Sequence, residues 1–188
     1  MPERMRLFIA INLAEAVRRQ LWEATTRLRA AEPAVKWVGV DGLHLTVKFL
    51  GEVDAAREPA IAGALDAALA GHRAFALEVD GCGAFPSLER PSVVWAGCAR
   101  TSPLELVYHD VEAACERLAF PLEARAFQPH VTLGRVRRGK HVADLAGRLD
   151  GVSVQASDRV ETVDLMQSVL GPEGPRYAVR HRTQLETD

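Results

Sequence analysis

The chain has 188 residues, of which 48% are apolar and 26% are charged, so it can bury a substantial core and is not disordered in composition. Its formal net charge of −2 excludes a protein whose whole surface attracts nucleic acid, and any attraction for phosphate must be local. The three cysteines, Cys82, Cys98 and Cys115, form no CxxC pair, which argues against a disulfide framework or a zinc site. No apolar run is long enough for a signal peptide or a membrane span, so we expect a soluble, cytoplasmic protein.

Hydrophobic periodicity and the placement of Gly and Pro predict a series of strands and helices. The expected strands cover residues 6–13, 35–40, 43–51, 75–79, 92–97, 127–136, 152–156, 159–170 and 177–185. The expected helices cover residues 15–31, 55–70, 104–118 and 141–149.

Turn residues connect these elements. Asp41-Gly42 is expected to turn the second and third strands into a hairpin, and residues 81–87 to form a Gly/Pro-rich loop. Pro172, Gly174 and Pro175 are expected to form a turn before the last strand, which is polar enough to lie at a sheet edge. No linker separates two independent domains.

The third strand carries the first motif, His44-Leu45-Thr46-Val47. Strict alternation places the imidazole and the hydroxyl on one face, about 6–7 Å apart along the strand. The same alternation places Lys48 on the motif face, where it meets substrate or solvent, and Phe49 on the apolar face, in the core.

The second half of the chain repeats this pattern in His130-Val131-Thr132-Leu133. Arg135 is expected to continue the polar face beyond Thr132. One HxT on a strand is more often structural than catalytic. Two of them, one in each half, predict two halves that face each other across one cleft, with the histidines placed symmetrically.

Paired histidines and threonines suit chemistry at phosphorus. One imidazole can act as general base and the other as general acid, on opposite sides of an in-line displacement. Two threonine hydroxyls can donate hydrogen bonds to the non-bridging oxygens. The sequence contains no HExxH, GxSxG, GxxxxGK[ST] or GxGxxG pattern, so it offers no motif for a zinc protease, a nucleophile elbow or a nucleotide cofactor.

The two tetrapeptides resemble the paired HxTx signature of the 2H phosphoesterase superfamily. Further segments are similar, in order and spacing, to its bacterial and archaeal RNA 2′,3′-cyclic phosphodiesterase branch, also called 2′–5′ RNA ligase. They are Arg6 to Ile11, Val35 to Val38, Asp41 to Leu43, Gly83 to Ser87, Phe127 to Pro129, and Leu165 to Tyr177. The resemblance covers nearly the whole chain. Gln128 departs from it, because an arginine is frequent at that position.

The resemblance implies an α+β, bilobal, pseudo-twofold fold, with two antiparallel sheets flanking a central cleft and helices outside. Residues 1–188 would form a single domain of two related lobes. It also implies metal-independent hydrolysis of an RNA terminal 2′,3′-cyclic phosphate to a 2′-phosphate, with reverse 2′–5′ ligation by the same groups and no cofactor. By position, His130 would be the base and His44 the acid, while Thr46 and Thr132 would hold the phosphate.

Other assignments from the sequence concern substrate contacts. Arg135 is a candidate to grip an RNA phosphate, and Phe85 is a better candidate than Trp37 to stack on a terminal base. The expected partners are RNAs with 2′,3′-cyclic phosphate ends, including tRNA fragments, and the expected state is a monomer without membrane contact. Two alternatives stay open: another 2H activity on a cyclic nucleotide, an ADP-ribose cyclic phosphate or a 2′–5′ oligonucleotide, and a non-catalytic module that only binds RNA ends.

Overall fold

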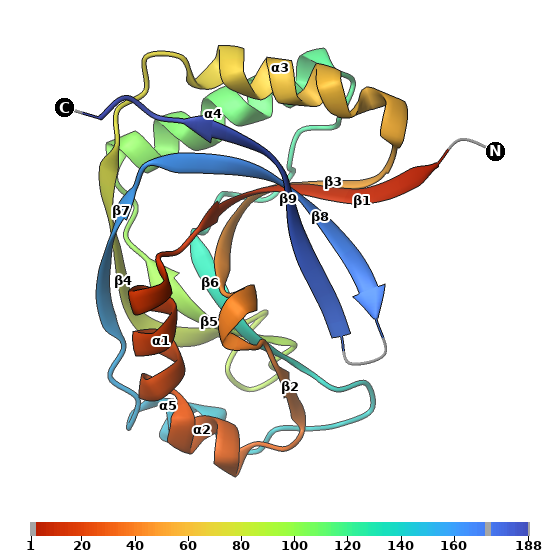
Figure 1. The fold of residues 1–188 in the computed structure, drawn as a ribbon. Coiled ribbons are helices and arrows are strands. Elements are labelled where there is room, and N and C mark those ends of the chain that lie inside the picture. Colours follow the sequence, from red (N-terminus) through yellow and green to blue (C-terminus); the bar gives the residue numbers. More distant parts are fainter. Residues whose placement is uncertain (1–2, 172–173, 188) are drawn as a thin grey trace.

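The computed structural model describes residues 3–171 and 174–187 (Figure 1). The strands are β1 (Arg4–Asn12), β2 (Val35–Trp37), β3 (His44–Asp54), β4 (Phe75–Phe85), β5 (Val93–Cys98), β6 (His130–Val136), β7 (Gln155–Val160), β8 (Thr162–Gly171) and β9 (Gly174–Gln184). The helices are α1 (Glu15–Ala24), α2 (Thr26–Ala31), α3 (Glu58–Leu69), α4 (Ser102–Arg117) and α5 (Leu145–Leu149), with 3-10 turns η1 (Val40–Gly42) and η2 (Ala55–Arg57).

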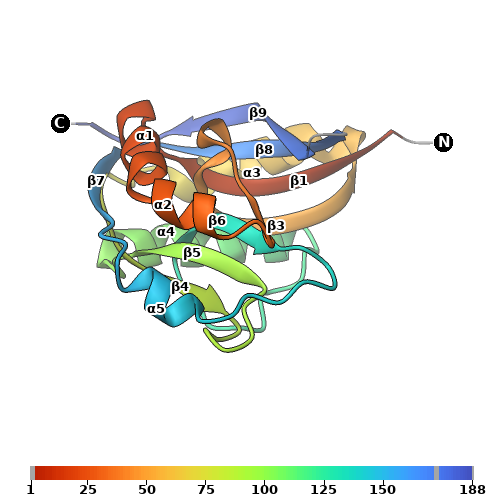
Figure 2. The same cartoon turned by 90° about the horizontal axis from the view of Figure 1, so that it is seen from below.

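The strands form one antiparallel sheet in the order β7-β4-β5-β6-β3-β1-β8-β9, with β2 paired to β6. This order is symmetric about its centre: β6 corresponds to β3, β5 to β1, β4 to β8, and β7 to β9. The expected α+β fold is therefore confirmed, but the two expected sheets are joined into one, where Leu45 pairs with Val131. Figure 2 shows the two halves curling away from this junction. How the lobes are related in origin stays a prediction.

The helices cover the outside of the sheet. Helices α3 and α4 lie side by side, with α3 against β9 and α4 against β3, while α1 contacts β7 and α5 contacts β4 (Figure 1). The apolar side chains between them form one continuous core, whose largest fully buried members include Leu7, Ile9, Leu45, Leu77 and Leu165. No helix in the described part of the chain is long and apolar enough to cross a membrane.

Most element predictions hold, with shifted boundaries. The helix expected over residues 15–31 is divided at Thr25, whose hydroxyl donates to the Leu21 carbonyl at 2.9 Å. Most of the loop expected over residues 81–87 instead belongs to β4, and the strand expected over residues 159–170 is divided between β7 and β8. The turn expected at Pro172 lies partly outside the described residues.

The predicted hairpin between the second and third strands is wrong. Strand β2 pairs with β6, where Trp37 lies opposite Gly134, and the η1 turn carries the chain on to β3. Gly134 permits this close pairing, because a Cβ there would lie 2.5 Å from Val35 Cγ1. A turn signal predicts that the chain reverses, but it does not name the strand that becomes the partner.

A β-bulge in β3 reverses the faces predicted for Lys48 and Phe49. Ala10 pairs with Thr46 and Ile9 with Lys48, so Val47 is an extra residue in β3. Alternation restarts beyond a bulge with the faces exchanged. As a result Lys48 is buried at 6% exposure and Phe49 is 64% exposed, the reverse of what the sequence pattern predicts.

The buried Lys48 ties three segments together. Its Nζ donates to Glu112 Oε1 of α4 at 2.7 Å and to the Pro121 carbonyl at 2.9 Å. The second carboxylate oxygen of Glu112 accepts from the Glu123 amide at 3.0 Å. The first motif strand is thereby fastened to α4 and to the segment that leads to the second motif strand.

Replacing Glu112 by Ala leaves the Lys48 ammonium buried without its carboxylate. We expect the free energy of unfolding, measured in urea titrations by circular dichroism, to fall by about 3–5 kcal/mol. The double variant Lys48→Met, Glu112→Leu removes both charges and is expected to recover most of that loss. Glu15→Ala, which removes the exposed partner of Arg19, is the matched control and is expected to cost less than about 1 kcal/mol. A similarly small loss for Glu112→Ala would contradict a stabilising role for the buried pair.

Candidate active site

Both motif strands bulge at the residue that follows the motif threonine. In β6, Thr132 pairs with Trp95 and Gly134 with Val94, so Leu133 is the extra residue, as Val47 is in β3. Strict alternation from Thr132 would place Arg135 on the opposite face, so the expectation that Arg135 continues the polar face holds only because of this bulge. The bulge returns the exposed Arg135 to the face of the motif histidine, at the position that corresponds to Phe49 in the other half.

The Leu45–Val131 pair brings the two motif histidines together. Each imidazole is held through Nδ1: His44 donates to the Gly42 carbonyl at 2.8 Å, and His130 donates to the Gln128 carbonyl at 2.6 Å. A carbonyl only accepts, so Nδ1 carries the proton and Nε2 of each neutral ring is the unprotonated nitrogen. The two rings thus have the same tautomer and the same kind of anchor, two residues back along the chain.

The motif threonines and Arg135 complete the polar group around the histidines. Thr46 and Thr132 are half-buried on the same faces as their histidines. The positive charge of Arg135 lowers the pKa values of His44 and His130, so its guanidinium lies near both rings. All five residues selected from the sequence therefore lie around one junction of the sheet.

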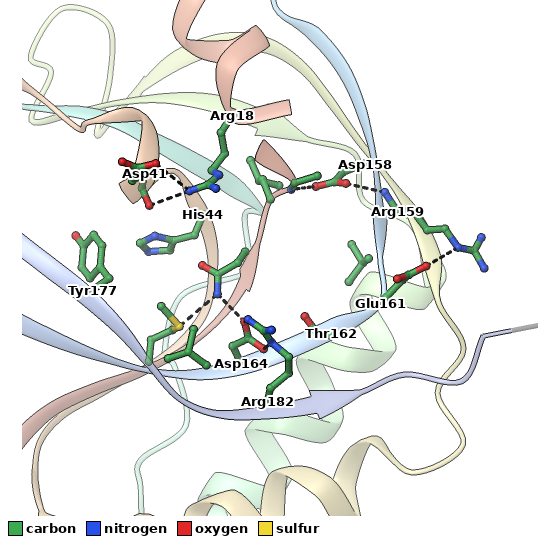
Figure 3. Close-up of a pocket in the computed structure, with 16 residues that line it drawn as sticks. Arg18, Asp41, His44, Asp158, Arg159, Glu161, Thr162, Asp164, Tyr177 and Arg182 are labelled. Carbon is green, nitrogen blue, oxygen red and sulfur yellow. Dashed lines mark hydrogen bonds and ion pairs between the residues drawn. The ribbon is translucent and has the colours of Figure 1, made fainter. Parts of the chain in front are cut away.

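An aromatic ring meets each histidine edge-on. Phe85 lies 4.9 Å from His130 between ring centroids at an interplanar angle of 82°, and Tyr177 lies 5.0 Å from His44 at 83° (Figure 3 shows the latter pair). Phe8 adds a second ring 5.1 Å from His44. Stacking of Phe85 on a base stays a prediction, while Trp37 donates to the Glu32 carbonyl and packs against the core.

Sequence reasoning missed Phe8 and Tyr177 as neighbours of His44. Phe8 lies in an apolar run whose burial is expected anyway, and Tyr177 lies in a strand predicted only as a polar edge. Trp95, opposite Thr132 in the sheet, was missed too. A Cβ on Gly83 would lie 2.4 Å from the Trp95 ring, so this glycine makes room for the indole beside Phe85 and His130. Gly83 was a usable signal, because a glycine inside a strand marks a close approach.

Burial dominates the electrostatics of the site. Together with smaller contributions from Arg135 and His130, and against the hydrogen bond to the Gly42 carbonyl, burial lowers the pKa of His44 to about 4. Burial and Arg135 also lower the pKa of His130. Burial raises the pKa of Tyr177, although Arg135 and Arg6 oppose this shift. At neutral pH the free site therefore holds a neutral His44 and a protonated Tyr177 near the Arg135 cation, and an arriving anion would favour protonation of an imidazole.

The cysteines form no disulfide, and the described residues hold no metal-binding cluster. Cys82, Cys98 and Cys115 are free thiols, and burial raises their pKa values to about 11, 12 and 11. Among residues 3–171 and 174–187, no group of three or more His, Cys, Asp or Glu side chains is arranged to hold a metal ion. Metal independence itself stays a prediction.

Comparison with known proteins identifies relatives along almost the whole chain. The family model described as the 2′-5′ RNA ligase superfamily matches residues 17–171. An RNA 2′,3′-cyclic phosphodiesterase of Methanothermobacter thermautotrophicus is 32% identical over 177 residues, which cover 93% of this chain and 95% of that relative. One of Thermotoga maritima is 33% identical over 186 residues, which cover 97% and 96% of the two chains.

Solved structures also match the chain over nearly its whole length. The crystal structure of TT0787 of Thermus thermophilus superposes with a TM-score of 0.82 at 30% identity, covering 98% of this chain and 100% of that one. The crystal structure of E. coli LigT complexed with 3′-AMP superposes with a TM-score of 0.76 at 27% identity, covering 97% and 99%. The curled sheet and its helices are thus shared with these proteins.

The lowered pKa of His44 links folding to pH. Between pH 6.5 and 4 the unfolded chain binds a proton that the folded chain does not, so the free energy of unfolding falls as the pH drops through this window. His44→Gln removes this contribution and is expected to lose less stability than the wild type on acidification, by up to roughly 3 kcal/mol. Urea titrations of both proteins from pH 7.5 to 4 test this, because the carboxylates common to both cancel in the difference. An equal loss of unfolding free energy in the wild type and in His44→Gln would contradict a lowered pKa of His44.

Proposed function

Because the chain belongs to the 2′-5′ RNA ligase superfamily, we propose that it hydrolyses the 2′,3′-cyclic phosphate at an RNA end and leaves a 2′-phosphate. The protein is a hydrolase of the cyclic phosphodiesterase class, and the proposal adds the residues and the course of the reaction. The observation that carries it is the pair of imidazoles, each anchored through Nδ1, with Thr46, Thr132 and Arg135 beside them.

The proposed reaction moves one proton at each histidine. Nε2 of His130 takes a proton from water as the water oxygen bonds to phosphorus. The bond between phosphorus and the ribose O3′ then breaks, and protonated His44 gives its Nε2 proton to that oxygen. The product is a 2′-phosphate monoester with a free 3′-hydroxyl. A 5′-hydroxyl of a second RNA, in place of water, would give a 2′–5′ linkage by the same steps.

His44 must carry a proton before it can act as the acid. Its pKa of about 4 keeps it neutral in the free protein at pH 7. The cyclic phosphate is an anion, and a negative charge beside an imidazole favours its protonated form. Substrate binding therefore supplies the charge that activates His44, which makes the acid selective for an anionic ligand.

The threonines and Arg135 would stabilise the charge that builds up on phosphorus. Thr46 and Thr132 each have a hydroxyl that can donate to a non-bridging oxygen, one from each half of the sheet. The Arg135 guanidinium is permanently charged and can bind two oxygens at once. These donors are held by strands, so they need little rearrangement when the pentacoordinate state forms.

Loss of either histidine should separate catalysis from folding. His44→Ala and His130→Ala are each expected to lower turnover of an RNA with a 2′,3′-cyclic phosphate end by roughly 10²–10⁴-fold, in EDTA, with cooperative unfolding retained. Mass spectrometry and phosphatase treatment identify the 2′-phosphate product, and His141→Ala, at an exposed position, is the matched control.

The outcomes of this assay bear on different parts of the proposal. Near wild-type turnover by either histidine variant would contradict the acid and base roles. Turnover of cyclic mononucleotides but not of RNA would favour another 2H activity. Binding of the RNA end without turnover by the wild type would favour the non-catalytic module.

Arg135→Gln tests two roles of Arg135 together: its contact with the substrate phosphate and its effect on the pKa values of the two histidines. We expect kcat/KM to fall about tenfold or more, and the pKa values of His44 and His130 to rise, because the guanidinium disfavours their charged forms. NMR titration of the imidazoles measures the second effect without substrate. Arg138→Gln, at an exposed position after β6, is the control. Unchanged pKa values of His44 and His130 in this variant would contradict a position of Arg135 beside the two rings.

A further inference from the structure

A cavity of about 440 Å³ opens directly beside His44 and is not used by the proposed chemistry (Figure 3). Its walls come from the start of α1, the end of β7 and the facing parts of β8 and β9, while His44 and Tyr177 form the side next to the active site. The volume lies in the range of sites that hold small organic ligands. Most of the lining is polar or charged, which suits a nucleotide better than an apolar molecule.

Most carboxylates of this cavity already have partners. Asp158 accepts from the Ala14 amide at 2.7 Å. The fully buried Asp164 accepts hydrogen bonds from Asn12 at 2.7 Å and from Arg182 at 3.1 Å. Glu161 forms an ion pair with Arg159. These groups offer fixed donors and acceptors of the kind that contact base edges.

Arg18 is a cation of the wall with an unsatisfied donor. Its Nη1 donates to the Asp41 carbonyl at 3.2 Å, and the Asp41 carboxylate lies 3.6 Å away on a side chain that is 94% exposed. The Nε of Arg18 is buried and has no hydrogen-bond partner within the described ranges. An unpartnered buried donor is costly, and a guanidinium with free donors beside a cleft is suited to phosphate.

The course of the reaction decides what reaches this cavity. If His44 protonates O3′, the ribose of the terminal nucleotide lies on the His44 side of phosphorus. The 5′ carbon of that ribose carries the phosphodiester to the preceding nucleotide, so the RNA chain leaves the active site on the same side. Arg18 lies there, bound to the residue next to Gly42, whose carbonyl anchors His44.

We propose that this cavity is a second nucleotide subsite, which holds the nucleotide on the 5′ side of the cyclic phosphate end while Arg18 binds the phosphodiester between the two. This inference rests on the proposed function. The subsite makes the enzyme selective for oligonucleotides over free nucleoside 2′,3′-cyclic phosphates, because a mononucleoside leaves the subsite empty.

The test compares two substrates with the same terminal base: a trinucleotide that ends in a 2′,3′-cyclic phosphate, and the corresponding nucleoside 2′,3′-cyclic phosphate. In the wild type, kcat/KM is expected to be higher for the trinucleotide. In Arg18→Ala the ratio of the two kcat/KM values is expected to fall about tenfold, as for loss of one charged contact to phosphate. Arg19→Ala is the matched control, because Arg19 is the next residue of α1, is exposed and pairs with Glu15.

Salt dependence and a second variant make the test independent of small shifts around His44. In Arg18→Ala, the slope of log kcat/KM against log salt for the trinucleotide is expected to become less negative by about 0.7, the value for one phosphate contact on a single strand. Thr162→Trp fills the cavity from the wall away from His44 and is expected to lower the same substrate ratio (Figure 3).

An unchanged substrate ratio in both variants would overturn the subsite, and so would an equal loss on both substrates in Arg18→Ala, since Arg18 would then act only through the position of His44. A wild type that turns over neither substrate would instead overturn the proposed function. The two failures are therefore distinguishable in one set of measurements.

Discussion

The centre of this structure depends on one backbone pairing, in which Leu45 of β3 lies opposite Val131 of β6. Side chains alternate along a strand, so this pairing turns the residues on either side of Leu45 and Val131 toward the same face at the spacing of neighbouring strands. Two histidines and two threonines from distant parts of the chain meet there. The junction is a single residue pair, so the two halves of the sheet can curl apart beyond it, and a cavity opens beside His44.

The bulges next to this junction determine which side chains of β3 and β6 are exposed beside the motif residues. By adding one residue after each motif threonine, they send the next side chains of β3 and β6 to faces that alternation would not give them. In one half this buries Lys48 against Glu112 and exposes Phe49; in the other it turns Arg135 toward the histidines. Two strands with a matching bulge thus present an aromatic side chain in one half and a cation in the other.

Much of the fold and of the site could be predicted from the sequence, because periodicity and the repeated His-x-Thr pattern are local properties. His44, Thr46, His130 and Thr132 could be placed on one face by alternation over three residues. The faces of Lys48 and Phe49 could not, because a bulge depends on the register between strands. The partner of β2 and the rings beside His44 depend in the same way on which segments become neighbours, and no local pattern specifies that.

Anchoring both imidazoles through Nδ1 also determines how the protein returns to its starting state. Each ring has only Nε2 left for exchange, and it cannot rotate without breaking its bond to the Gly42 or Gln128 carbonyl. In the proposed reaction a proton leaves His44 and another arrives at His130, so the site ends a turnover with its charge on the opposite half. Proton exchange with the solvent reverses this, and a site sealed over its product would slow that exchange. The cavity beside His44 therefore gives solvent access to the ring that must regain its proton.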